Sequence, residues 1–239
     1  PLPEQRCIAE ILDSADEAIR QTRRVIAKLR DVKKGLLHDL LTRGLDADGN
    51  LRDPDAHPEQ FKNSSLGRLP REWRVEKGED IADLITKGAS PRWQGFEYQT
   101  EGILFITSEN VREGFLDVSD PKFISEDFDR KLQRARLEAG DILVNLVGAS
   151  IGRSCIYSGE FESANINQAV CTFRLKRSIV PSWVLSYLRM PKTVSRLLED
   201  QVETARANIS LGQVSEFLFP LPSPREQRRI AAILDAHDA

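Results

Sequence analysis

Apolar residues recur every seven positions through the first 43 residues of the chain, and charged residues fill the positions between them. Neither proline nor glycine interrupts this pattern between Pro3 and Gly35, and Gly44 follows as a typical C-terminal stop. A heptad stripe of four to five repeats is typical of a coiled coil, because the supercoil keeps it facing one partner. We predict a long helix over residues 1–43 that pairs with another helix; a core helix of a bundle is the alternative. The predicted interface seam consists of Ile8, Ile11, Leu12, Ile19, Val25, Ile26, Leu29, Val32 and Leu36.

The pattern changes after this helix. Residues 44–68 are polar and rich in turn-forming Asp, Asn, Gly and Pro, which predicts a linker. Short apolar runs typical of strands then alternate with helical patterns. The strand candidates are residues 103–107, 141–147 and 168–175, and the helical candidates are residues 125–135 and the segment from Ser182, interrupted at Pro191. We therefore expect a mixed α+β globular domain over residues 69–219.

The start of the first helix recurs near the end of the chain. Residues 1–13, Pro-Leu-Pro-Glu-Gln-Arg-Cys-Ile-Ala-Glu-Ile-Leu-Asp, match residues 220–235 at eleven of thirteen positions once a three-residue insertion is allowed. In the second copy, Ser223, Pro224 and Glu226 have the pattern of a capping box. The chain thus holds one full period of a repeat of about 220 residues, and residues 220–239 are expected to begin a second long helix. Since the chain begins without Met, we expect an excerpt of a longer protein or a processed form.

Composition narrows the class of protein. With 34 Lys and Arg against 37 Asp and Glu, the formal charge is −3, which excludes a histone-like protein and confines any nucleic-acid contact to a local patch. Three separated cysteines without a C-x-x-C pair argue against a disulfide scaffold or a zinc site and favour the cytoplasm. No apolar run approaches the ~20 residues of a membrane helix, and no basic segment followed by an apolar run opens the chain, so nothing argues for secretion. We expect a cytoplasmic protein without membrane contact.

The motifs of common enzymes are missing from the sequence. The glycine-rich segment 148–154 has no lysine, so we interpret it as a turn between strands and not as a phosphate-binding loop. The three histidines are scattered, and Pro54-Asp55 lacks the downstream Glu-x-Lys of a common nuclease site. The Asn-Pro-Pro-aromatic motif, with which amino-methyltransferases clamp adenine, is absent as well. We therefore predict a non-catalytic protein with no cofactor and no metal site.

Groups suited to nucleic acid follow the predicted strands. Arg reads guanine and Asn or Gln reads adenine, whereas Lys, Ser and Thr suit phosphate oxygens. A loop with glycine and proline at 87–94 and three strand-end segments farther along the chain concentrate such side chains. The predicted DNA-binding residues are Lys87, Ser90, Arg92, Trp93, Gln94, Ser108, Asn110, Arg112, Asn145, Ser150, Arg153 and Asn167. For each residue, the alternative is that it merely satisfies a turn or a sheet edge.

Position within the loops assigns two roles to some of these residues. A glycine lets the backbone approach a phosphate closely, so we assign to phosphate contact three polar residues that lie within two positions of a glycine, Lys87, Ser90 and Arg153. Longer or amide-bearing side chains in strand-end loops suit base edges. We assign that role to Arg92, Gln94, Asn110 and Arg112.

Several motifs together resemble the specificity subunits of type I restriction–modification systems. They are the repeated Pro-Leu-Pro-x-x-Glu-Gln helix start, the helix end at 36–44, the domain opening at 69–73, and the segments 140–143 and 167–170. The resemblance covers essentially the whole chain. It implies a target-recognition domain that reads half of a split double-stranded DNA site, between long helices that pair antiparallel and fix the spacer. It also implies methyltransferase subunits as partners and, through them, restriction subunits.

This sequence has one complete helix and one such domain, so it resembles half a subunit. We expect it either to pair with a second copy of itself or to lie inside a longer chain. The favoured function is a DNA-binding subunit that directs an adenine-methylating restriction complex. A coiled-coil assembly adaptor whose α+β domain binds protein is the alternative, and a fragment of a larger enzyme is a third. Residue identity does not reveal the target bases, because readout depends also on loop geometry and DNA deformability.

Overall fold

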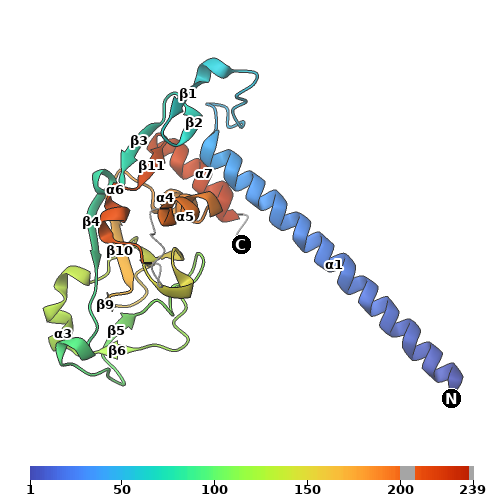
Figure 1. Ribbon diagram of the computed structural model, residues 1–239, viewed down its shortest axis with the longest axis horizontal. Helices are drawn as coiled ribbons and strands as arrows, with labels where there is room; N and C mark the ends of the chain where they lie inside the picture. Colours follow the sequence, from blue (N-terminus) through green and yellow to red (C-terminus); the bar gives the residue numbers. More distant parts are fainter. Residues whose placement is uncertain (200–207, 237–239) are drawn as a thin grey trace.

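A long helix projects from a mixed α+β domain in the computed structural model, which describes residues 1–199 and 208–236 (Figure 1). The predicted first helix is confirmed: α1 spans Leu2–Thr42, and Gly44 follows in the left-handed region with φ 62°. At ~1.5 Å per residue this helix is about 60 Å long. Its N-terminus lies far from the domain, whereas Leu40 and Leu41 in its last turn are buried in the main core. The end of α1 is therefore part of the domain, and residue 43 does not separate two independent units.

The predicted linker at 44–68 contains more structure than its composition indicates. A 3-10 helix, η1 (Pro58–Gln60), leads into β1 (Phe61–Ser64), which pairs antiparallel with β2 (Gly67–Pro70). Phe61 is buried, and the Ser64 hydroxyl donates a hydrogen bond of 2.7 Å to the carbonyl of Gly67 across the turn. The hairpin escapes sequence analysis because its strands are short and its turn-forming residues look like those of a loop.

Two sheets form the middle of the domain. The first is antiparallel with the strand order β4 (Ala82–Lys87), β10 (Val170–Leu175), β7 (Ile142–Asn145), β8 (Ser154–Ile156). The second has the order β6 (Phe123–Ile124), β5 (Ile103–Ile106), β9 (Ala164–Ile166), with β5 parallel to β9. A two-stranded ribbon of β3 (Arg74–Lys77) and β11 (Leu218–Leu221) lies where the chain enters and leaves the domain. The three predicted strands thus correspond to β5, β7 and β10.

Short helices cover these sheets. They are α2 (Gly78–Ile81), α3 (Glu126–Lys131), α4 (Pro181–Leu188), α5 (Pro191–Leu198), α6 (Leu211–Glu216) and α7 (Pro224–Ala236), with 3-10 helices η2 (Arg92–Gln94), η3 (Gln133–Ala135) and η4 (Gly148–Ser150). Ser125 caps α3 as predicted, because its hydroxyl accepts from the N–H of Phe128. The α-helix ends at Lys131, however, and η3 completes the segment predicted as one helix. Pro191 interrupts the helical segment as expected and begins α5.

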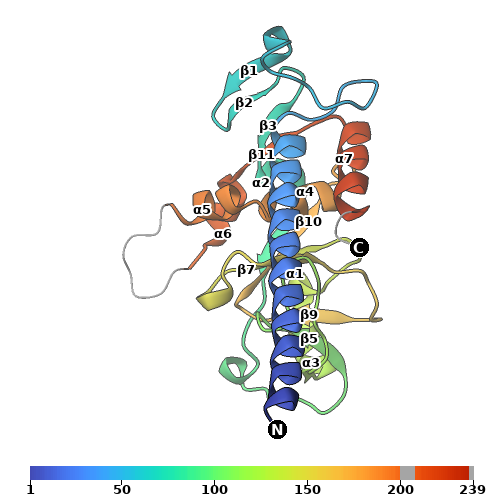
Figure 2. The same cartoon turned by 90° about the vertical axis from the view of Figure 1, so that its right-hand side faces the viewer.

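The main core lies where α1, α4, α7 and the antiparallel sheet meet. Trp73 and Trp183, both fully buried, pack edge to face there with ring centroids 5.4 Å apart. Ile230 and Leu234 of α7 fill the same core. Figures 1 and 2 show α7 beside the C-terminal end of α1, and the remainder of α1 projects beyond it. The last predicted residues of this second helix, 237–239, lie outside the described residues.

No helix within 1–199 and 208–236 has the length and apolar character needed to span a bilayer. Burial raises the pKa of Cys155 and of Cys171 to about 12, so both remain protonated thiols near neutral pH.

Candidate nucleic-acid interface

Parallel strands β5 and β9 bring two predicted DNA-binding segments together. Ile106 pairs with Ile166, so the chain leaves both strands at the same edge of the sheet. The N–H of Asn167 donates to the carbonyl of Ile106 over 2.9 Å, which places Asn167 beside the start of the loop that carries Ser108. Segments some 60 residues apart in the sequence therefore lie side by side.

The antiparallel sheet adds two more strand ends to this edge. Val170, the first residue of β10, pairs with Asn145 at the end of β7. The next residue, Cys171, pairs with Lys87 at the end of β4. The sheet register thus gathers Lys87, Asn145 and Asn167 around the start of β10, and Lys87 is exposed there.

A groove of about 630 Å³ opens between two loops at this edge. One wall is the loop that follows β5, and the other is the turn that contains η4 between β7 and β8. The glycine-rich segment forms this turn, as predicted, with Gly148 and Gly152 both at φ 80°. The structure brings five of the predicted DNA-binding residues to the groove, namely Ser108, Asn110, Arg112, Ser150 and Arg153.

Ion pairs organise one side of the groove. Arg112 lies 3.1 Å from Asp117 (Nη2 to Oδ2), and Lys122 pairs with Glu109. The hydroxyl and N–H of Ser119, together with Arg112, hold the pKa of Asp117 below its usual range. Lys122 likewise lowers the pKa of Glu109. Both carboxylates are therefore ionised and paired near neutral pH, and the Arg112 guanidinium is oriented by its partner.

Arg153 differs from the other groove cations. Its side chain is exposed, and it makes no ion pair or side-chain hydrogen bond with the residues that the structure describes. The preceding Gly152 is buried against Val194, so a ligand can reach Arg153 only through its exposed side chain. A free guanidinium beside an open turn suits a phosphate oxygen.

Two predicted DNA-binding residues have internal roles instead. Asn110 is 8% exposed; its Oδ1 accepts from the N–H of Thr107 (2.8 Å), and its Nδ2 donates to the carbonyl of Asp117 (2.9 Å). Asn145 is 0% exposed and donates to neighbouring loops. We correct the assignment of Asn110 to a base edge, and of Asn145 to DNA contact, because both side chains are buried and their amides form hydrogen bonds within the domain. An asparagine at a strand end looks the same in sequence whether it serves a ligand or its own loop.

The loop with glycine and proline lies apart from the groove, against α3. The ring of Phe96 packs 5.0 Å from that of Phe128, so the loop is anchored at the end of the domain away from α7 (Figure 1). Trp93 at its tip is 82% exposed. Arg92 pairs with Glu97 over 3.6 Å, and Gln94 is exposed beside it, whereas Ser90 is half-buried. The predicted residues thus form two surfaces, the groove and this loop tip.

Asn167 lies between these two surfaces. Its Oδ1 accepts from the N–H of Ala169 over 3.0 Å, and its carbonyl accepts from the N–H of Gly88 over 3.2 Å. A Cβ at Gly88 would collide with the backbone of Ile166, so only glycine permits this close approach. Asn167 is half-buried and fixes the start of the loop that carries Trp93.

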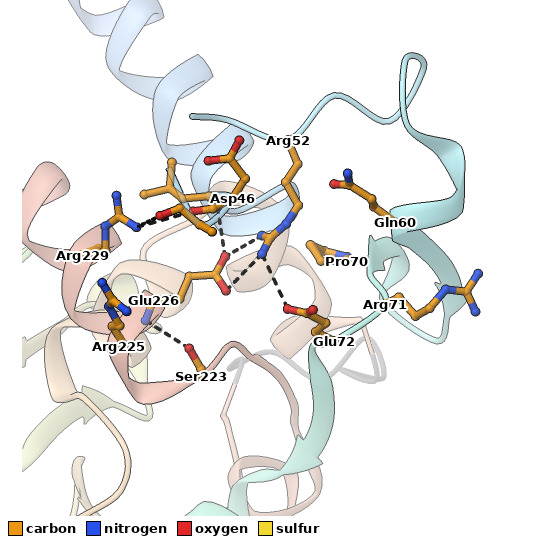
Figure 3. Close-up of a pocket in the computed structure, with 12 residues that line it drawn as sticks. Asp46, Arg52, Gln60, Pro70, Arg71, Glu72, Ser223, Arg225, Glu226 and Arg229 are labelled. Atoms are coloured by element: carbon orange, nitrogen blue, oxygen red, sulfur yellow. Dashed lines mark hydrogen bonds and ion pairs between the residues drawn. The ribbon is translucent and has the colours of Figure 1, made fainter. Parts of the chain in front are cut away.

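A second cluster was not predicted as a functional site. At the start of α7 the Glu226 carboxylate accepts hydrogen bonds from Arg52 Nη1 (2.6 Å), the Leu45 N–H (2.9 Å) and Trp73 Nε1 (3.2 Å). Figure 3 shows Glu226 and Arg52 converging in a cavity of about 510 Å³. Both side chains are about one-tenth exposed, at 11% and 10%. The cluster joins the end of α1, the linker and the domain opening to α7.

This cluster corrects the predicted capping box. The Ser223 hydroxyl does accept from the N–H of Glu226, but the Glu226 carboxylate does not return to the N-cap, because the other partners occupy it. The sequence did carry a signal for the cluster: Glu226 belongs to the repeated motif, and Trp73 belongs to the domain-opening motif. Gly44 is required beside it, since a Cβ there would collide with Glu226 and Trp73.

The two copies of the repeated motif lie in opposite environments. Ile230 and Leu234 of α7 are 0% and 7% exposed, whereas their counterparts Ile8 and Leu12 of α1 are 51% and 60% exposed. The remaining seam residues up to Val32 are exposed as well, and Leu36 is half-buried against the core. An apolar stripe of this length on one helix is typical of a surface that binds another protein segment.

Comparison with known proteins identifies the family. Residues 70–239 match the type I restriction modification DNA specificity domain. The MjaVIII specificity subunit of Methanocaldococcus jannaschii is 29% identical over 245 residues, covering 100% of this chain and 54% of that protein. The EcoBI specificity subunit of Escherichia coli is 27% identical over 238 residues, covering 96% of this chain and 48% of that protein. The chain thus spans about half the length of these relatives.

Solved structures share the fold. The HsdS subunit from Thermoanaerobacter tengcongensis has a TM-score of 0.59 at 23% identity, over 100% of this chain and 51% of that chain. The type I S subunit from M. genitalium has a TM-score of 0.55 at 18% identity, over 98% and 54%. The predicted fold class, an α+β domain with a long N-terminal helix, is confirmed. Since the matched segment covers more than half of its residues, this chain belongs to the family of type I restriction modification DNA specificity domains.

Proposed function

We propose that this chain supplies one non-catalytic DNA-recognition domain and one spacing helix of a cytoplasmic type I restriction–modification complex. The domain reads one part of a split double-stranded DNA site and directs adenine methylation and restriction carried out by partner subunits. The observation that carries the proposal is the groove at the strand ends. There an exposed Arg153, without an ion pair among the described residues, and a preoriented Arg112 lie among hydroxyl groups.

The groove and the loop tip have different chemistry toward DNA. We assign Lys87, Ser90 and Arg153 to phosphates, which fix the register of a protein on the duplex. Arg112, held by Asp117, presents a planar fork that suits the O6 and N7 atoms of guanine. On the loop tip, Arg92 and Gln94 suit base edges, and the exposed Trp93 offers an apolar face to bases or sugars.

The first test is selection of bound duplexes from a random library in the presence of the methyltransferase partner. Enrichment of a defined half-site of about three to five base pairs supports the proposal; uniform binding or no binding contradicts it and favours an adaptor whose α+β domain binds protein. The selected duplex and its single-base variants then serve as probes for individual residues.

Replacing Arg153 with alanine should weaken binding to every duplex by a similar factor. A lost phosphate contact reduces the slope of log affinity against log salt by about one unit without changing base preference.

Replacing Arg112 with alanine should instead cost about 1–3 kcal/mol of binding free energy on the preferred site and relax preference at one base pair. Fluorescence anisotropy at several salt concentrations distinguishes the two outcomes. A uniform loss across all duplexes for Arg112→Ala, Arg92→Ala and Gln94→Ala would show that specificity lies in other loops or in DNA shape.

We propose further that the exposed seam of α1 pairs antiparallel with another long helix. This helix comes either from the remaining half of a longer chain or from a second copy. The repeated motif supports this proposal, because the same apolar residues are buried on α7 and exposed on α1. A motif repeated at related positions also suits two copies of one methyltransferase subunit, with restriction subunits joining through them.

Removing residues 1–30 should abolish co-purification with the methyltransferase subunit while leaving the domain folded. The deletion stops well before Leu40 and Leu41, because these residues are buried in the core and their loss would unfold the domain. Tandem affinity purification measures the partner, and near-UV circular dichroism with a thermal melt measures the domain. Stoichiometric retention of the methyltransferase by the truncated chain would place its docking surface on the domain.

A further inference from the structure

We propose that Asn145 is a positioning residue that sets the spacing of the two loops at the groove and thereby controls base selectivity. The inference rests on the proposed DNA-recognition function and assigns a role that follows from the side-chain geometry. Asn145 is the last residue of β7, and its side chain points away from solvent, with 0% exposure.

The two amide hydrogens of Asn145 serve opposite walls of the groove. Nδ2 donates to the carbonyl of Ser108 over 2.9 Å and to the hydroxyl of Ser150 over 3.0 Å. Ser108 belongs to the loop after β5, and Ser150 belongs to η4. A single buried group thus connects segments 37 and 5 residues away from it in the sequence.

The backbone of Asn145 strengthens the link to one wall. Its N–H donates to the carbonyl of Arg153 over 2.9 Å, and its carbonyl accepts from the N–H of Gly152 over 2.8 Å. The turn that carries Arg153 is therefore held to the end of β7 by main-chain bonds. The loop that carries Arg112 is joined to this rigid point through the Asn145 side chain, so the amide decides how the two walls are placed relative to each other.

Burial makes this amide an unusual choice for a purely structural position. Asn145 Oδ1 is buried and has no hydrogen-bond partner among the described residues. A buried oxygen without a partner is unfavourable, and an apolar side chain would avoid it. The two hydrogen bonds that the amide donates compensate for this cost, and both acceptors belong to residues that line the groove.

The physical consequence concerns selectivity more than general affinity. Base readout requires side chains to be held within about half an ångström, whereas phosphate attraction tolerates displacement. If the link is broken, the Arg112 loop and the Arg153 turn can shift independently. Binding to the correct half-site then loses its advantage over single-base variants, while attraction to any duplex persists.

The test compares Asn145→Ala with a matched control, Thr172→Val. Thr172 lies in β10 of the same sheet, is equally buried, and has a hydroxyl without a partner among the described residues, so its replacement alters a buried polar group without touching either loop. Both chains are measured on the selected half-site, on its single-base variants and on random duplex. Asn145→Ala should lose about tenfold or more of the preference for the half-site, with random-duplex affinity within about twofold. Thr172→Val should keep the preference.

Substitutions at Ser150 test the proposed link between the two loops even if the Asn145→Ala chain fails to fold. Ser150→Ala removes the hydroxyl that orients the Asn145 amide so that its other hydrogen reaches the Ser108 carbonyl, and Ser150→Thr restores this hydroxyl. The link requires that selectivity falls with alanine and returns with threonine. An equal loss of affinity for every duplex, with selectivity unchanged, would show that Ser150 only touches phosphate and would overturn the inference. Unchanged selectivity in a folded Asn145→Ala chain overturns it equally. If the unaltered chain selects no half-site, the proposed function itself fails, which is a distinguishable result.

Discussion

Replacing Glu226 with alanine should lower the free energy of unfolding by about 3–5 kcal/mol, the usual cost of breaking a buried ion pair from one side. The substitution leaves the Arg52 guanidinium, the Trp73 N–H and the Leu45 N–H without their shared acceptor. Arg52 is only 10% exposed, so water cannot fully replace the carboxylate. For a chain of this size, the loss corresponds to a fall in melting temperature of roughly 6–20 °C. Urea unfolding followed by tryptophan fluorescence measures both the midpoint and the slope.

The repeat provides a matched control for this prediction. Glu4 is the same residue in the first copy of the motif, but its side chain is 68% exposed. Glu72, which lies 4.0 Å from Arg52, is 87% exposed. Replacing either with alanine should change stability by no more than about 0.5 kcal/mol, as for ordinary surface positions. Equal stability of the Glu226→Ala and Glu4→Ala chains would mean that the junction does not hold α1 and α7 to the domain.

Replacing Ile19 and Ile26 with aspartate should abolish pairing of α1 with its partner helix. These side chains are 48% and 43% exposed in the single chain, and each would contribute roughly 1.5–3 kcal/mol if a partner covers it. Losing both corresponds to a weakening of association by about two to four orders of magnitude. Analytical ultracentrifugation of the 239-residue chain should show a self-associated species for the original sequence and a poorly soluble monomer for the double variant.

A second double variant controls for added negative charge. Arg20 and Ala27 have the same seven-residue spacing but lie about 100° farther round the helix, off the apolar stripe. Aspartate at these two positions should leave association intact. If the original chain sediments as a well-behaved monomer at every concentration tested, the seam does not mediate self-pairing, and pairing would require the remaining half of a longer chain.

The local pattern of apolar and polar residues was sufficient to predict the elements that have a regular periodicity. A heptad stripe without breakers predicted α1 to within a residue of its observed ends, because helical periodicity is a property of the chain itself. The alternation of short strands and helices likewise predicted an α+β domain. The β1–β2 hairpin was missed, since its pairing depends on contacts that turn-rich composition conceals.

The candidate site was predictable only in part. Residue types at strand ends pointed to Ser108, Arg112, Ser150 and Arg153, and the parallel pairing of β5 with β9 brings their loops together. Asn110 and Asn145 had the same residue type and the same kind of position, yet their amides face inward. Which way a side chain points at a strand end depends on the neighbouring loop, and no sequence pattern specifies that neighbour.

The long helix, the repeated helix start, the α+β character and the residue types available to bind DNA can all be predicted from the sequence. The environment of each copy of the repeat depends on the tertiary structure. The same Glu-Gln-Arg-x-Ile-Ala pattern has its apolar residues exposed on α1 and buried on α7. The physical reason is that burial depends on what packs against a residue. Glu226 meets Arg52 and Trp73 because the chain returns through β11 beside β3, whereas Glu4 lies at the free end of a projecting helix.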